Sequence, residues 1–183
     1  MENAIDSTLV QRFSCFQSLN PEQIAVLATR LEEVRLSPHH VLFRQGDPGD
    51  AVYMLLRGRI LIKLGESTPD ERILATLQSG AIFGEMGPLT GEPRTASAVT
   101  AIETHLWRIS TSTFYQALEH GEAWSTHFLL ASARLLGRRV MALNEELVKL
   151  AGELHEHSTQ PQIRKAVAEI EQLRKRLTTE WTF

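Results

Sequence analysis

The segment IFGEMGPLTGEPRTASA, from Ile82 to Ala98, separates two apolar runs and carries the most distinctive chemistry of the chain. Glu85 and Arg94 stand nine positions apart in it, and the residues between them include two glycines and two prolines without a regular hydrophobic period. Such a composition excludes a long helix and a central strand. We therefore expect a loop or a short capped turn that connects two strands.

The polar groups of this segment suit a ligand that carries both a phosphate and a hydroxyl. Gly84 and Gly87 leave backbone amides open to close approach, and Pro88 is compatible with the first turn of a short helix whose N–H groups face an anion. Arg94 can pair with two phosphate oxygens, and Glu85 can accept a hydrogen bond from a hydroxyl. This set fits a phosphodiester beside a free sugar hydroxyl. The alternative is a solvated loop between two strands of an ordinary barrel.

The letters FGEM at 83–86 and GEPRTAS at 91–97 resemble the phosphate-binding cassette of cyclic-nucleotide-binding domains. That family includes bacterial catabolite activators and the regulatory subunits of cyclic-nucleotide-dependent kinases, and the spacing here matches the kinase-subunit form. The resemblance implies that Glu85 binds the ribose 2′-hydroxyl and that Arg94 binds the cyclic phosphate.

The same resemblance implies roles for the neighbouring residues. Gly84 and Met86 would bind through backbone amides, and Thr95 and Ala96 would close the phosphate site. Pro88 departs from the family pattern, which usually has leucine there. It is expected to alter the short helix and weaken its array of amides.

Short apolar runs flank the cassette and alternate with glycine-containing turns. The expected strands are Val41–Phe43, Ala51–Leu56, Ile60–Leu64, Arg72–Leu77, Thr95–Val99 and Glu103–Ile109. Many short strands with regular glycine turns predict an antiparallel sandwich or barrel. From Phe13 to Leu118 the chain also resembles the β-roll of the family. That resemblance places Ile62 and Leu74 on strands that face the sugar and base, although both also fit an ordinary core.

Two helical stretches precede and follow these strands. Asn20, Pro21 and Gln23 predict a capped helix start, and apolar residues then recur at helical spacing as far as Val34. After Ile109, a short helix capped by Ser112 or Thr113 is expected to run to Leu118.

A long helix is expected after the break at His120 and Gly121. Its apolar residues alternate by three and four over close to four heptads: Leu129, Ala133, Leu136, Val140, Leu143, Leu147, Leu150 and Leu154. A stripe this narrow and long is typical of a coiled coil, and we expect a parallel homodimer through this helix. The alternative is a core helix that packs within one chain.

The resemblance to the activators also bears on the base. In those proteins two polar residues of the long helix contact the base, and the alignment places Leu143 and Asn144 there. Leu143 is apolar and departs from that pattern. Asn144 can bind a purine edge or can be an exposed polar residue of the helix, and both readings remain open.

The C-terminal stretch predicts one more amphipathic helix, which begins at Pro161. Residues 155–183 have room for one such helix but not for a winged helix-turn-helix. The formal charge of −3 also gives no broad attraction to nucleic acid. We therefore expect no direct DNA binding, and a last helix that pairs with its twin, covers an apolar groove or meets a protein partner.

The composition of the 183 residues excludes several other classes of protein. A single cysteine, Cys15, excludes an internal disulfide, and His155 and His157 are two positions apart and cannot share a helix face, so no metal site is expected. The sequence contains no P-loop and no nucleophile–base pair, so it does not predict an enzyme. It also has no signal peptide and no membrane-spanning run, which predicts a cytoplasmic chain without membrane contact.

These observations predict a mainly β chain with flanking α-helices. An antiparallel, jelly-roll-like β-roll with N-terminal helices (1–120) is followed by a long dimerisation helix (121–157) and a short C-terminal helix (158–183). The predicted function is a stand-alone receptor for cyclic AMP, or alternatively cyclic GMP, that needs no cofactor and signals to a protein partner by conformational change. Two alternatives are an interaction module with a degenerate pocket, favoured by Pro88 and Leu143, and the regulatory subunit of a separate enzyme.

Overall fold

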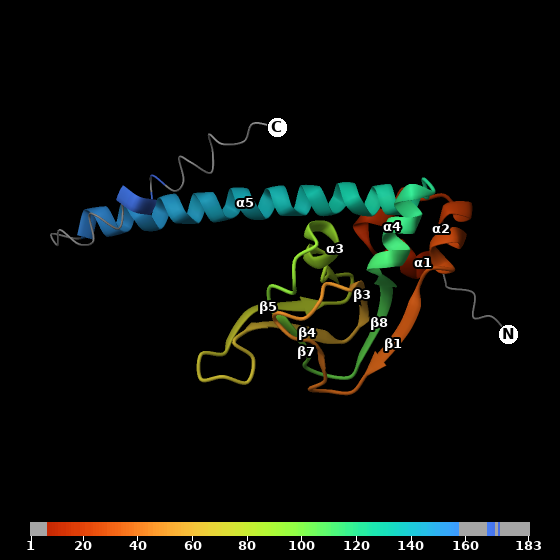
Figure 1. Cartoon of the computed structure of the whole chain (residues 1–183), viewed down its shortest axis with the longest axis horizontal. Coiled ribbons are helices and arrows are strands. Elements are labelled where there is room, and N and C mark those ends of the chain that lie inside the picture. Colours follow the sequence, from red (N-terminus) through yellow and green to blue (C-terminus); the bar gives the residue numbers. More distant parts are fainter. Residues whose placement is uncertain (1–6, 158–167, 171, 173–183) are drawn as a thin grey trace. The chain divides into compact units, whose positions relative to one another are not determined.

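The computed structural model describes residues 7–157, 168–170 and 172. The chain divides into two compact units, residues 1–131 and residues 132–183. In the first unit, two four-stranded antiparallel sheets form a β-roll with helices beside it (Figure 1). The predicted fold class, a mainly β chain with a long helix after the roll, is confirmed.

The two sheets have the strand orders β1-β8-β3-β6 and β2-β7-β4-β5. The strands are β1 (Glu32–Leu36), β2 (Val41–Phe43), β3 (Ala51–Arg57), β4 (Arg59–Leu64), β5 (Arg72–Gln78), β6 (Ile82–Phe83), β7 (Ser97–Thr100) and β8 (Thr104–Ser110). All six of the strands expected from the sequence occur, each within two residues of its predicted bounds. Neighbours along a sheet are often distant in sequence: β8, for example, pairs with both β1 and β3.

The first strand, β1, was not expected, and here the prediction of a helix that continues to Val34 was wrong. Helix α2 (Pro21–Ala28) ends as Thr29 turns its hydroxyl back to the carbonyl of Val26, at 2.7 Å. Val34 instead lies opposite Leu106 in the β1–β8 ladder. The position of Val34 is compatible with both a helical and a strand pattern of apolar residues. Pairing with a strand that is distant in sequence selects the strand.

Strand β3 is buried on both faces and separates two apolar clusters. Val52, Met54 and Leu56 pack with the helices on one face of the sheet. Ala51, Tyr53 and Leu55 point into the roll and pack with Phe83, Ala98 and Leu106. Because successive side chains of a strand alternate between faces, this one continuous apolar run supplies both cores.

Two helices of the first unit, α2 (Pro21–Ala28) and α4 (Thr111–Glu119), begin at side-chain caps. The helices of this unit are α1 (Ser7–Val10), the 3₁₀ turn η1 (Ser14–Phe16), α2, α3 (Met86–Thr90), α4 and the first turns of α5 (Ala123–His157). The predicted capping box of Asn20 and Gln23 is present, with both bonds at 2.9 Å. The predicted cap of α4 was wrong: Ser110, the last residue of β8, accepts the hydrogen bond from the amide of Thr113.

Helix α5 is a single helix of 35 residues that starts after the break at Gly121, where φ is +67°. No helix of the described residues is both long and apolar enough to cross a membrane. The predicted C-terminal helix falls largely outside the described residues, of which only 168–170 and 172 belong to it and are helical.

The corner between α4 and α5 is fixed by Glu122. Its carboxylate accepts hydrogen bonds from Arg30 and, at 2.6 Å, from the indole nitrogen of Trp124. The bond from Arg30 keeps the pKa of Glu122 below its ordinary value of 4.5, and the bond from Trp124 acts in the same direction against the effect of burial. A carboxylate whose pKa is lowered by folding stabilises the fold above its ordinary pKa, and this contribution is lost as the pH falls below it.

We predict that Glu122→Gln lowers the free energy of unfolding at neutral pH, because the charged partner of Arg30 and Trp124 is removed. The difference between parent and variant should shrink as the pH falls below 4.5. Urea unfolding at neutral pH and at pH about 3 measures both quantities. The control is Glu119→Gln, which removes an exposed carboxylate of α4. Equal losses in the two variants would contradict a specific role of Glu122.

Candidate functional site

The cassette connects β6 to β7 and contains the short helix α3, as the glycines and prolines of this segment predict. Pro88 occupies the third position of α3, where its missing N–H would have had no partner in the helix. Gly91 ends the helix in the left-handed conformation, with φ +74°, and donates its N–H to the carbonyl of Gly87 at 2.9 Å. This glycine end cap is a common way to stop a helix and reverse the chain.

Gly84 is required by both its backbone and its surroundings. Its φ is +75°, a conformation that side chains rarely tolerate. An added Cβ would lie 2.9 Å from a guanidinium nitrogen of Arg94 and 3.3 Å from the ring of Tyr53. The absence of a side chain at Gly84 therefore lets Arg94 reach the backbone of its own cassette.

A second close approach joins the cassette to the turn before β3. A Cβ added to Gly87 would lie 2.5 Å from the Cα of Gly49, and a Cβ added to Gly49 would also meet the carbonyl of Glu92 at 3.1 Å. The two glycines thus pack backbone against backbone. Sequence reasoning treated both as turn or loop residues and did not predict this contact.

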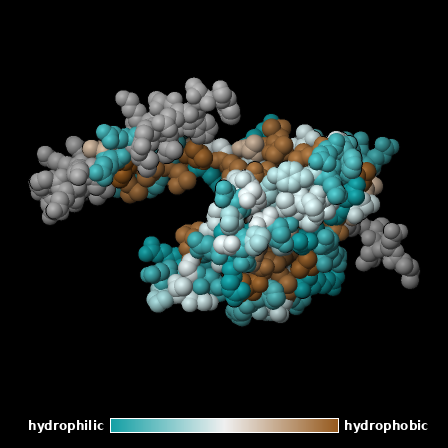
Figure 2. Space-filling model, in the orientation of Figure 1, coloured by the Kyte–Doolittle hydropathy of each residue, from teal (hydrophilic) through white to brown (hydrophobic). Residues whose placement is uncertain are grey.

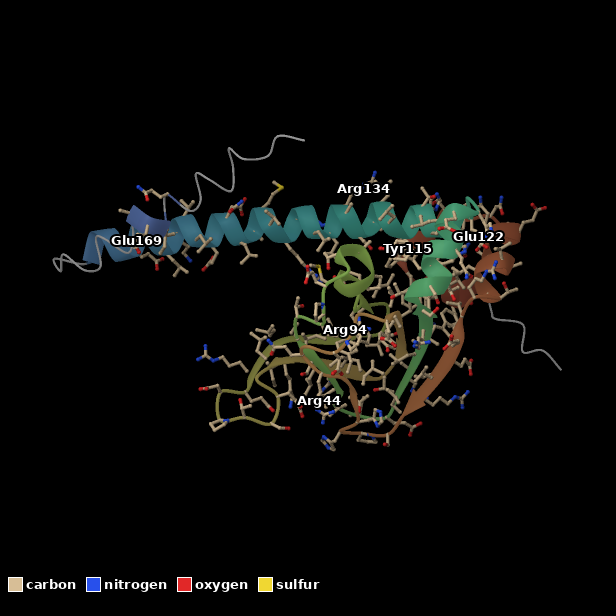
Figure 3. The ribbon with its side chains drawn as sticks, in the orientation of Figure 1. Arg44, Arg94, Tyr115, Glu122, Arg134 and Glu169 are labelled. Carbon is tan, nitrogen blue, oxygen red and sulfur yellow. The ribbon has the colours of Figure 1, made fainter. Side chains whose placement is uncertain are left out.

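Arg94 is buried inside the roll, with only 4% of its surface exposed (Figure 3). Its Nη1 donates to the carbonyl of Gly84 at 2.7 Å, and its Nη2 donates to the carbonyl of Ala51 at 2.8 Å and to the carboxylate of Asp50 at 3.0 Å. Its guanidinium also lies 4.2 Å from the centre of the Phe43 ring, a cation–π contact. These contacts fix the orientation of the charged group.

One nitrogen of this guanidinium remains without a partner in the described part of the chain. The Nε of Arg94 is buried and has no hydrogen-bond partner among the described residues. An unpaired buried donor is costly, and a phosphate oxygen would satisfy it with a charge-assisted bond. The geometry therefore supports Arg94 as an anion-binding residue.

Glu85 is equally buried, with 4% exposed, and it occupies the position just before α3. The sequence therefore brings two charged residues of opposite sign into one buried cassette. Buried carboxylates and guanidiniums are rare in proteins unless they are paired or functional. The two side chains are therefore not those of a solvated loop, and their binding roles remain a prediction.

The other predicted site residues lie at different depths. In the cassette, Met86 is half-buried, Thr95 is exposed and Ala96 is buried. Ile62 packs against the inner cluster of the roll, whereas Leu74 on the edge strand β5 is exposed. Both positions are compatible with contact to a ligand, and that role remains a prediction.

The two helix positions predicted to meet the base belong to the second unit. Leu143 is exposed and Asn144 is half-buried on α5. The contact of Asn144 with a base remains a prediction.

Sequence reasoning missed three charged residues that extend from Arg94 in a series of ion pairs. Asp50 pairs with Arg94 through one oxygen and with Arg108 on β8 through the other, at 3.1 Å. Arg108 also binds Glu32 on β1 at 2.8 Å. The alternation of β8 offered a signal, because Arg108 shares the inward face of the strand with the buried Leu106.

Comparisons with known proteins agree with this geometry. A family model described as "Cyclic nucleotide-binding domain" matches residues 33–120. The chain is 29% identical over 144 residues to the CRP-like cAMP-activated global transcriptional regulator of Mycobacterium tuberculosis, and the match covers 78% of this chain and 62% of the regulator. It is 31% identical over 106 residues to the cAMP-dependent protein kinase regulatory subunit of Eremothecium gossypii, with 58% of this chain and 22% of the subunit covered.

A solved structure shows the same arrangement. The crystal structure of Thermus thermophilus catabolite activator protein aligns with a TM-score of 0.66 and 31% identity, over 76% of this chain and 64% of that one. The chain thus spans less than two thirds of the length of each of these three relatives.

We predict that Gly49→Ala lowers the free energy of unfolding by about 1–3 kcal/mol, since the added methyl group overlaps the backbone of Gly87. Chemical denaturation followed by circular dichroism measures this change. The matched control is Gly137→Ala, in the interior of α5, where an added Cβ has no atom of the described residues within 4 Å. That variant should gain about 0.5–1 kcal/mol from helix propensity. An unchanged stability of Gly49→Ala would show that the two segments can separate without cost.

Proposed function

Residues 33–120 belong to the cyclic nucleotide-binding domain family, and we propose that the chain is a cyclic nucleotide receptor in its own right, which signals to a protein partner by changing conformation. The observation that carries this proposal is the burial of Glu85 and Arg94 in one cassette, with the Nε of Arg94 left as a free donor. A cyclic phosphate satisfies that donor and the ribose 2′-hydroxyl donates to Glu85. A domain kept only as a scaffold would not need this pair of buried charges.

The ligand that we propose is cyclic AMP, with cyclic GMP as the alternative. Thr95 follows Arg94 directly and is exposed, so its hydroxyl is available to a base. A hydroxyl at this position is compatible with either purine. The regulator and the kinase subunit described above are named for cAMP, and this favours the adenine form here.

A structural route for the signal starts at α3. The hydroxyl of Tyr115 on α4 donates a hydrogen bond to the carbonyl of Pro88 at 2.7 Å, so α3 and α4 are linked (Figure 3). Helix α4 leads through residues 120–122 into α5. A ligand that binds more tightly to one position of α3 shifts the connected helices toward the matching conformation. The coupling free energy of such a shift is typically ~1–3 kcal/mol.

We also propose a homodimer through α5. Val140, Leu143 and Leu150 of the predicted stripe are exposed large apolar residues, and Figure 2 shows hydrophobic surface along this helix. Their spacing is that of a coiled-coil seam. A second copy of the chain would bury this surface.

A second candidate function is an interaction module that binds no nucleotide, and a third is the regulatory subunit of a separate enzyme. The exposed Leu143, apolar where a base-reading residue was expected, favours the module. The relation to a kinase regulatory subunit favours the third candidate. We propose that the chain is not itself an enzyme, because its buried charges are arranged for binding.

We predict that titration calorimetry detects saturable binding of cyclic AMP to the purified chain, and that Arg94→Ala weakens it by ~2–5 kcal/mol through loss of the phosphate partner. Cyclic GMP titrated in parallel gives the base preference. Arg35→Ala serves as the control, since it removes an exposed arginine of β1 and should leave affinity unchanged.

Folding of each variant is checked by thermal unfolding, because Arg94 also bonds to Gly84 and Ala51. A folded Arg94→Ala protein that binds as tightly as the parent would refute the phosphate role. A parent protein that binds neither nucleotide would favour the interaction module.

We predict that the parent sediments at twice its chain mass of 20.6 kDa and that Leu143→Glu sediments as a monomer, because a charge in the seam opposes association. Met141→Glu is the matched control. Met141 is as exposed as Leu143, at 65% against 64%, but lies off the stripe, so its variant should remain dimeric. Sedimentation equilibrium separates these outcomes, and a dimeric Leu143→Glu protein would exclude this seam.

A further inference from the structure

We propose that Arg108 is a positioning residue for the phosphate site, which holds Asp50 so that Asp50 in turn orients Arg94. This inference rests on the proposed cyclic nucleotide binding. It adds to the site a residue outside the cassette, on a strand that is not expected to touch the ligand.

Four side chains of alternating charge form a continuous chain beside the cassette. Glu32 binds Nη1 of Arg108 at 2.8 Å, and Nη2 of Arg108 binds one oxygen of Asp50 at 3.1 Å. The other oxygen of Asp50 binds Nη2 of Arg94 at 3.0 Å. Every ion pair in this series therefore joins side chains of opposite charge.

Asp50 needs such a restraint because its side chain is 58% exposed. An exposed carboxylate held by one partner is free to exchange that partner for water, and such surface pairs are worth little. Asp50 is held at both oxygens instead, and this fixes the oxygen that faces Arg94. The orientation of a buried guanidinium thus depends in part on a carboxylate at the surface, beside the two backbone carbonyls that it also contacts.

Arg108 is itself fixed by the register of the sheet. On β8 it lies directly opposite Glu32 of β1 on one side and opposite Tyr53 of β3 on the other. Directly opposite residues of antiparallel strands have side chains in contact. Burial alone would lower the pKa of Arg108, but hydrogen bonds with Glu32, Asp50 and Tyr53 outweigh it and raise the pKa.

Arg108 also has an electrostatic effect on the site. Asp50 carries a negative charge close to the guanidinium that would receive the anionic phosphate, and like charges repel. Arg108 offsets that charge without entering the cassette. Loss of Arg108 would therefore weaken phosphate binding in two ways, through a less ordered Arg94 and through an uncompensated Asp50.

A double-mutant cycle tests this proposal by calorimetry with cyclic AMP on the parent, Arg108→Gln, Asp50→Asn and the double variant. We expect Arg108→Gln to raise the Kd about tenfold. Its effect should be largely absent when Asp50 is already Asn, because the two residues act through one contact. Additive effects, or an unchanged Kd in Arg108→Gln, would overturn the proposal. Arg35→Gln, on the neighbouring strand β1, is the control and should bind like the parent.

A ligand-free measurement separates failure of this inference from failure of the proposed function. The Nε proton of Arg94 is followed by ¹⁵N NMR, and its exchange with solvent should be slow in the parent and faster in both Arg108→Gln and Asp50→Asn. An unchanged exchange rate in Arg108→Gln would overturn the positioning role even if no nucleotide binds. If the parent shows this coupling but binds neither nucleotide, the proposed function fails and the contribution of Arg108 to Arg94 order stands.

A purely structural role of Arg108 gives a different result. It would lower the free energy of unfolding of Arg108→Gln while the Kd and the exchange of Arg94 stayed at parent values, and this would overturn the proposal. If Arg108→Gln does not fold, Glu32→Gln replaces it, since it removes one anchor of Arg108 and leaves Asp50 in place. That variant should change the Kd and the Arg94 exchange in the same direction by a smaller amount.

Discussion

The rest of the site depends on the contacts that the buried guanidinium of Arg94 makes. A charge taken out of water is costly unless every polar atom finds a partner. Two backbone carbonyls, one carboxylate and an aromatic ring meet this requirement for most of the group. They come from the cassette, from Asp50 and Ala51 at the start of β3, and from β2, so segments distant in sequence must converge for Arg94 to be buried.

Backbone contacts hold these segments together. The amide of Arg94 donates to the carbonyl of Asp47 at 2.8 Å, and the amide of Gly46 donates to the carbonyl of Arg94 at 2.8 Å. The close contact of Gly49 with Gly87 is only possible because neither residue has a side chain. The turn and the cassette therefore behave as one unit, and a ligand that moves α3 must act against this contact.

The two faces of strand β3 contact different parts of the first unit. The inner face of β3 contributes Tyr53, whose ring stacks on Phe43 and Phe83 next to Arg94. The outer face of the strand contributes Val52 and Met54 to the cluster beneath α4 and the start of α5. One strand thus contacts both the surroundings of Arg94 and the helices, because alternate side chains of β3 point to opposite sides of the sheet. This arrangement gives a short physical connection between the candidate site and the helices.

The sequence by itself determined six of the strands, the cassette helix and the break at Gly121. It also pointed to the two charged residues of the cassette, Glu85 and Arg94, whose binding roles remain a prediction. These features depend on local chemistry: alternation, turn residues and the match of a functional group to a phosphate or hydroxyl. Only the tertiary structure decided that Val34 belongs to a strand, that Ser110 caps α4, and that Asp50 links Arg94 to Arg108 and Glu32. Each of these depends on contacts between residues that are far apart in the chain, or on where a neighbouring element ends. The physical reason is that local periodicity specifies an element, whereas strand register and burial specify which elements meet.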